Sequence, residues 1–129
     1  MNSDISKREA FYPEAIELES YGNGGFRFGE MSHKGSLLIL QSGIYAWDYQ
    51  SFEDVDLKAF DLLFREAGDT EFLLFGTGVE QRFPTSQMKD AFYKAGLGIE
   101  VMDTGAAART YNVLINEGRK VAAALIAVE

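Results

Sequence analysis

Cysteine is absent from this chain of 129 residues, which excludes disulfide bonds, thiolate metal sites and cysteine nucleophiles. Histidine occurs once, as His33, outside any cluster of acidic or hydroxyl side chains. A lone histidine of this kind favours a surface or structural role over a functional one. No group of Asp and Glu has metal-ligand spacing either, so we expect neither a metal nor a cofactor.

Positive charge is also scarce, because 12 Lys and Arg stand against 20 Asp and Glu and leave a net charge of −8. Nucleic acids and anionic membrane surfaces select basic proteins, so both are disfavoured as partners. The longest apolar run, residues 121–128, is far shorter than the ~20 residues of a membrane-spanning helix. The first nine residues are charged and lack the apolar centre of a signal peptide. We therefore expect a cytoplasmic protein without membrane insertion.

What the chain does contain is typical of a globular protein, with 47% hydrophobic and 25% charged residues. Its length suits one domain with one core. We expect a single domain over residues 1–129, in which the polar segment 1–13 is a frayed entry to the fold.

The first part of the chain predicts a small antiparallel hairpin. Apolar and acidic residues alternate over 16–18, a pattern typical of a half-buried strand. Asn-Gly at 23–24 favours a type I′ turn, and the alternation at 26–28 predicts the return strand. Residues 31–35, which include the histidine, are expected to form a turn.

From residue 36 onward, predicted strands alternate with predicted helices. Apolar runs indicate strands at 37–40, 44–47, 72–75, 99–102 and 121–128. Apolar stripes of helical period lie between Asp56 and Gly68, between Thr85 and Gly96, and between Asp103 and Gly118. This alternation is typical of an α/β sheet with helices on both faces. Because 121–128 has no polar residue and no alternation, we expect it to be an interior strand buried on both faces.

Two loops at strand ends form a candidate ligand site, since such loops face a common crevice in an α/β sheet. Free N–H groups at a helix N-terminus attract a small phosphate or carboxylate, although Asp103 would repel an anion. Neither GxGxxG nor a Walker loop is present. The residues therefore allow an anion site, or only close packing and helix capping. The candidate ligand-binding residues are Thr77, Gly78, Thr104, Gly105 and Arg109.

Four aromatic residues follow the glycine at position 43, separated by polar side chains. If they are buried, they belong to the core; if they are exposed, they mark a protein–protein contact. Both interpretations stay open. The candidate interface residues are Tyr45, Trp47, Tyr49 and Phe52.

Several blocks of sequence carry a family resemblance. They are GGFRFG (24–29), HKGSLLIL and SGIYAW on either side of Gln41 (33–47), LLFGTG (73–78) and MDTGAAARTYNVLINEGRKVAAALIAV (102–128). Together they resemble a small bacterial and archaeal family of domains of unknown function, related to mitochondrial NADH dehydrogenase 1 alpha subcomplex assembly factor 3. The resemblance implies a three-layer α/β fold with a central mixed sheet and a small β-hairpin layer.

The same resemblance implies a non-enzymatic role in which the chain binds other proteins, such as subunits of a membrane complex or their assembly factors. The residues agree with this, since they supply no acid/base pair and no nucleophile with a base. We therefore expect a cytoplasmic, assembly-factor-like binding domain. The alternative is a binder of small anions, or an enzyme, that uses the crevice between Gly76–Gly78 and Asp103–Arg109.

Overall fold

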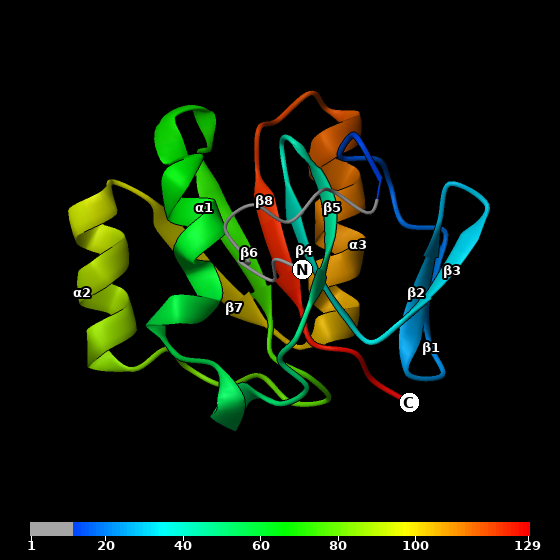
Figure 1. Cartoon of the computed structure of the whole chain (residues 1–129), viewed down its shortest axis with the longest axis horizontal. Coiled ribbons are helices and arrows are strands. Elements are labelled where there is room, and N and C mark those ends of the chain that lie inside the picture. Colours follow the sequence, from blue (N-terminus) through cyan, green and yellow to red (C-terminus); the bar gives the residue numbers. More distant parts are fainter. Residues whose placement is uncertain (1–11) are drawn as a thin grey trace, which may run out of the picture.

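The computed structural model describes residues 12–129, and its centre is a mixed sheet of five strands. The spatial order is β5-β4-β8-β6-β7. The strands are β4 (Ser36–Leu40), β5 (Gly43–Trp47), β6 (Phe72–Gly76), β7 (Gly98–Met102) and β8 (Ala122–Leu125). β6 pairs in parallel with both β7 and β8, whereas β4 pairs antiparallel with β5 and β8 (Figure 1).

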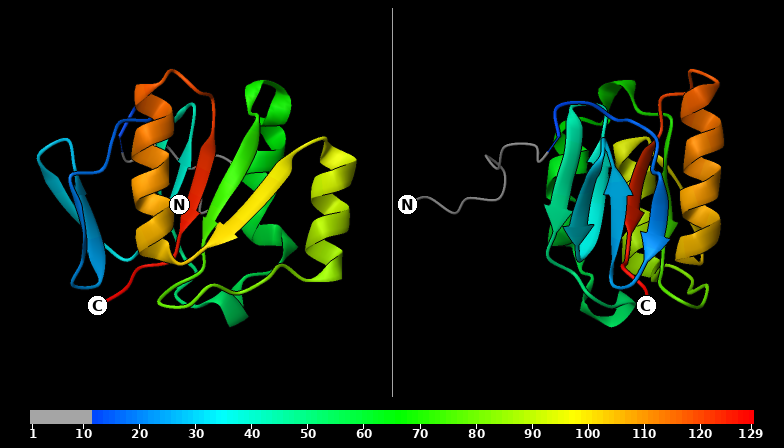
Figure 2. Two further views of the ribbon diagram at one scale, coloured as in Figure 1. Left: turned by 180° about the vertical axis from the view of Figure 1, so that it is seen from behind. Right: turned by 90° about the vertical axis from the view of Figure 1, so that its right-hand side faces the viewer.

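Helices cover the two faces of this sheet, so that the molecule has three layers (Figure 2). α1 (Asp61–Arg65) and α2 (Ser86–Ala95) pack on one face over an aromatic core, with ring contacts among Phe60, Phe75 and Phe92. α3 (Thr104–Asn116) packs on the other face, where small alanines of the helix and of β8 let the backbones approach. The α/β fold predicted from the sequence is confirmed.

β8 is the middle strand of the sheet, because it lies between β4 and β6. All residues from Val121 to Ile126 are buried, and Ala122 to Leu125 have no exposed surface. An apolar run without alternation therefore corresponds to a strand covered on both faces. The strand is shorter than the run, since Ala127 and Val128 are half-buried and continue as an extended chain.

The N-terminal part forms a three-stranded antiparallel sheet rather than a two-stranded hairpin (Figure 2). β1 (Ser20–Gly22) and β2 (Gly25–Phe28) are joined through Asn23 and Gly24, both with positive φ, as the predicted turn requires. The expected turn at 31–35 is wrong for its first four residues. They form β3 (Met31–Lys34), whose side chains alternate between half-buried and exposed.

The strand expected at 16–18 is also wrong. This segment pairs with a side chain of α3 instead of with another strand: the Asn112 amide accepts from the Leu18 N–H at 2.8 Å and donates to the Leu18 carbonyl at 2.8 Å. The Tyr111 hydroxyl donates to the Ile16 carbonyl at 2.8 Å. An extended segment whose backbone groups bind side chains can show the same sequence alternation as a strand. It lacks the backbone hydrogen bonds to a neighbouring strand that define a strand.

The helix expected between Asp56 and Gly68 is broken into short pieces. A 3-10 turn at Leu57–Phe60 leads into α1, and a second 3-10 turn follows at Ala67–Asp69. The other two helices begin at the expected residues, since Thr85 caps the N-terminus of α2 and Asp103 caps that of α3. Gly96 ends α2 in a left-handed conformation, also as expected. The frayed segment expected at 1–13 lies outside the described residues except for Tyr12 and Pro13. Tyr12 is paired with Ile44 of β5.

Candidate functional site

The two predicted strand-end loops meet at the carboxyl ends of β6 and β7. The Thr104 N–H donates to the Gly78 carbonyl at 2.8 Å, and the Gly78 N–H donates to Thr104 Oγ1 at 3.0 Å. Thr104 Oγ1 in turn donates to the Ile126 carbonyl at 2.7 Å, and the residue has no exposed surface. The structure thus brings these residues together, with the Thr104 hydroxyl facing backbone groups of the fold.

The Thr77 hydroxyl is engaged in the same way. Its Oγ1 lies 2.6 Å from the Glu80 carbonyl oxygen and 3.2 Å from the Met102 carbonyl oxygen, and it accepts from the Arg82 N–H at 2.9 Å. Thr77 is 4% exposed. This hydroxyl fixes the path of the loop that follows β6.

The start of α3 is covered by a side chain of the small sheet. A Cβ on Gly105 would lie 2.5 Å from the Tyr21 hydroxyl oxygen, so Tyr21 stands directly over this glycine. Arg109 Nη1 donates to the same oxygen at 3.1 Å, and Asp103 Oδ1 accepts from the Ala106 N–H at 2.8 Å. The Gly105 position therefore accommodates Tyr21, a contact that the sequence did not predict. Ligand binding here stays a prediction.

The predicted aromatic interface residues divide between core and surface. Tyr45 and Trp47 are 6% and 4% exposed, and Trp47 Nε1 donates to the Ala59 carbonyl at 2.9 Å. Tyr49 and Phe52 are half-buried: Tyr49 lies against Trp47 with ring centroids 5.2 Å apart, and Phe52 stacks on Phe75. Of the two open interpretations, Tyr45 and Trp47 follow the core interpretation, because β5 points them toward the aromatic core.

A hollow of about 290 Å³ lies at the carboxyl ends of β6 and β8, and we call it the carboxyl-end hollow. Its lining includes Phe52, Glu53, Val79, Glu80, Arg82 and Ile126. The Arg82 guanidinium is ion-paired with Glu53 and lies 5.2 Å from the centre of the Phe52 ring. A hydrogen bond from its own backbone N–H, together with the hydrogen bond from Arg82, lowers the pKa of the Glu53 carboxyl.

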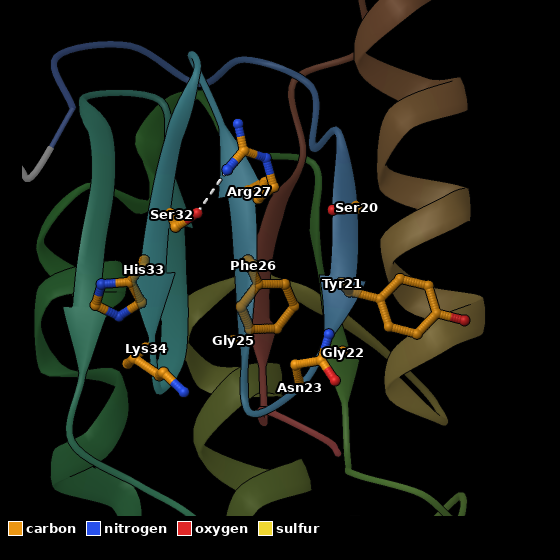
Figure 3. Close-up of a pocket in the computed structure, with 10 residues that line it drawn as sticks. All are labelled: Ser20, Tyr21, Gly22, Asn23, Gly25, Phe26, Arg27, Ser32, His33 and Lys34. Carbon is orange, nitrogen blue, oxygen red and sulfur yellow. Dashed lines mark hydrogen bonds between the residues drawn. The ribbon is translucent and has the colours of Figure 1, made fainter.

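A second hollow, of about 220 Å³, lies on the small sheet (Figure 3). The register places Ser20, Arg27 and Ser32 side by side across β1, β2 and β3, and Arg27 Nη1 donates to Ser32 Oγ at 2.7 Å. His33 also lines this hollow. Burial lowers the pKa of its imidazole, against a smaller opposing contribution from its contact with the Ser36 carbonyl.

Sequence reasoning missed the most exposed apolar residues near these sites. Val79 and Phe83 lie on the loop between β6 and α2 and are 81% and 73% exposed. Their signal is the placement of two apolar side chains among Gly78, Glu80 and Pro84, in a segment too irregular for a strand or a helix.

These features define an α/β domain with a mixed central sheet, an added antiparallel sheet and close-packed strand-end loops. The family model described as "Protein of unknown function (DUF498/DUF598)" matches residues 18–126, and the chain belongs to this family. The solved structure of an outer membrane protein from Bartonella henselae is similar, with a TM-score of 0.88 and 40% identity. That match covers 92% of this chain and 99% of the other.

Curated relatives also cover nearly all of the chain. An uncharacterized protein of Rhodobacter capsulatus is 35% identical over 122 residues, 95% of this chain and 93% of its own length. Human NADH dehydrogenase [ubiquinone] 1 alpha subcomplex assembly factor 3 is 32% identical over 122 residues, again 95% of this chain. The chain spans 65% of the human protein and 66% of its rat counterpart, so it corresponds to a part of each.

Proposed function

We propose that the chain is a non-enzymatic, assembly-factor-like domain that acts through contacts with other proteins. The observation that carries this proposal is the extent of its similarity to the assembly factor, which covers 95% of the chain. A match of that extent cannot leave out either sheet, because each sheet spans far more of the chain than the 5% outside the match. What the two proteins share is therefore a whole scaffold and not a short motif.

The state of the polar groups at the strand ends supports a binding role over chemistry. Reactive or ligand-binding groups must be available to a substrate, whereas the Thr77 and Thr104 hydroxyls already bind backbone atoms. Apolar side chains that protrude into solvent, such as Phe83, are typical instead of protein contacts. The anion-binding alternative has no comparable support.

We further propose that the partners are subunits of a membrane complex or their assembly factors, met in the cytoplasm. Within residues 12–129, no helix combines the length and the apolar character needed to cross a bilayer. A domain of this kind would contact the exposed parts of such subunits before or during their assembly.

Two measurements in the source cells test this function. Deleting the gene should reduce the amount of assembled respiratory NADH dehydrogenase on native gels, and restoring the wild-type gene should recover it. An affinity-tagged chain should retain subunits or assembly proteins of that complex, at several times their level on a tag-only control. An unchanged amount of complex after deletion, together with no retained protein above the control, would refute the assembly role.

A further inference from the structure

We propose that the loop Thr77–Thr85, which joins β6 to α2, is the docking element for the partner protein. Val79 and Phe83 would enter an apolar pocket of the partner, while the carboxyl-end hollow receives a partner side chain. The partner's pocket would carry basic residues on its rim. This inference rests on the proposed function and assigns a surface to it.

The loop is irregular in structure but is held at several points by polar contacts. Thr77 binds the Glu80 carbonyl and the Arg82 N–H, as described above. Gln81 Nε2 donates to the Val101 carbonyl at 3.0 Å and so ties the loop to the edge strand β7. Arg82 is ion-paired with Glu53, so a third contact ties the loop to the 3-10 turn at Phe52–Asp54.

The two large apolar side chains of this anchored loop, those of Val79 and Phe83, protrude into solvent. Phe83 is the only phenylalanine in residues 12–129 that is largely exposed to solvent, because the others pack wholly or partly into the core. Burying an exposed apolar side chain on association is favourable, and little entropy is lost when the loop that carries it is already ordered. Anchored polar residues with protruding apolar neighbours are therefore what a preformed docking loop requires.

The carboxyl-end hollow extends the same surface, since Val79 lines it. Its volume of about 290 Å³ has Phe52 and Ile126 among its apolar walls. A partner that covers Val79 would thus also lie over a hollow able to accept one of its side chains. Protrusion and recess side by side give a surface of defined shape.

Charge indicates which partner fits. Glu80 is exposed on the loop, and Arg82, the only basic residue of Thr77–Thr85, is ion-paired with Glu53. With a net charge of −8, the chain would repel an anionic membrane and a second copy of itself. Basic residues around the partner's pocket would instead be attracted to this negatively charged surface.

Four variants of the tagged chain test the assignment, with Tyr93→Ser as the matched control. Tyr93 lies on α2, the helix that the loop enters, and is 84% exposed. Phe83→Ser and Val79→Ser should each lower the amount of partner that the tagged chain retains at least tenfold, while Tyr93→Ser should leave that amount unchanged. Glu80→Lys should lower it less. All four should melt within about 1 °C of wild type, because surface substitutions seldom alter stability.

A photo-crosslinker at position 83 should attach to partner residues that lie among apolar and Lys or Arg side chains, and one at position 93 should not. Equal retention by all variants would overturn the docking loop and leave the assembly role intact. Retention of nothing by wild type, with unchanged complex after gene deletion, would remove both. A Phe83-dependent dimer in sedimentation, or Phe83-dependent binding to phosphatidylcholine vesicles, would show a different occupant and overturn the assignment.

Discussion

The two sheets of this molecule differ in how many of their faces are buried. Every residue of β4 and β8 is buried, because helices cover both faces of the five-stranded sheet. In the three-stranded sheet, β3 alternates half-buried and exposed residues, and Arg27 stands exposed between the buried Phe26 and Phe28 of β2. The large sheet is the core of the fold, whereas the small sheet is attached to it along one face.

The attachment uses a few specific contacts. Asn112 and Tyr111 of α3 bind the backbone just before β1, Arg109 of α3 binds Tyr21, and the Gly24 N–H donates to the Val128 carbonyl at 2.8 Å. α3 therefore supplies most of these polar contacts, while the buried Phe26 and Phe28 of β2 pack in one cluster with Leu37, Ile39 and Ile44 of the large sheet. The stability of the small sheet should depend on α3 far more than that of the large sheet depends on the small one.

The largest expected effect is that of a charge in the interior strand. Ala123→Asp would place an unpaired carboxylate at a position without any exposed surface, and we expect it to cost more than about 4 kcal/mol in the free energy of unfolding. Ala95→Asp, at the exposed end of α2, should cost less than about 1 kcal/mol. Urea unfolding of both variants measures the difference. Similar midpoints for the two would contradict the placement of β8 inside the core.

A smaller effect is expected where α3 holds the small sheet. Asn112→Ala leaves the Leu18 N–H and carbonyl without their partner, which should cost about 1–3 kcal/mol. Asn116→Ala, one turn later on the same helix and exposed, is the control and should cost less than about 0.5 kcal/mol.

Hydrogen exchange locates the effect of the same variant. Amides of β1 to β3 should exchange faster in Asn112→Ala, while those of β4 and β8 keep their wild-type protection relative to global unfolding. Uniform loss of protection in both sheets would show that they unfold as one unit, and the comparison between them would fail.

Sequence patterns predicted the large sheet better than the small one for a physical reason. A strand buried on both faces must be apolar throughout, so 121–128 was recognisable without any knowledge of its neighbours. β3 carries Ser32 and Lys34 on a face that meets solvent, and its half-buried face includes the polar His33, so the sequence resembles a turn. The segment 16–18 alternates like a strand, yet its partner is the Asn112 side chain, 94 residues away.

The candidate site was predictable to the same extent. Parallel strands end at the same edge of a sheet, and this rule alone predicts that Gly78 and Thr104 lie close together, as they do. That Tyr21 would cover Gly105 depends on how the small sheet docks on α3, a contact between residues 84 positions apart that no local pattern encodes. The exposure of Val79 and Phe83 likewise depends on which side of the loop is anchored.

His33 should make the stability of the molecule depend on pH. Burial lowers the pKa of its imidazole below the ordinary value of 6.5, so the unfolded chain binds a proton more readily than the folded one. The contribution of the neutral His33 imidazole to stability is therefore fully present above pH 6.5. It is lost as the pH falls from that value toward the lower pKa of the folded state. The melting temperature of wild type should fall between pH 7.5 and 5.5 by more than that of His33→Gln. Parallel profiles would show that the imidazole is equally solvated in both states.

The smallest effect concerns Arg109, where the small sheet meets the start of α3. Its exposed guanidinium binds the Tyr21 hydroxyl, so Arg109→Ala should change the free energy of unfolding by a few tenths of a kcal/mol.

If the turn held an anion, phosphate or acetate would raise the melting temperature of wild type through linkage, and the rise would vanish in this variant. We expect no Arg109-dependent rise, because Asp103 repels anions from the helix start and Tyr21 covers Gly105. A thermal-shift series with both anions on both proteins decides the matter, and Tyr21→Phe separates the two contributions. It removes the hydroxyl that Arg109 binds but keeps the ring over the glycine, so a rise confined to Tyr21→Phe would show that this hydroxyl occupies the position of an anion.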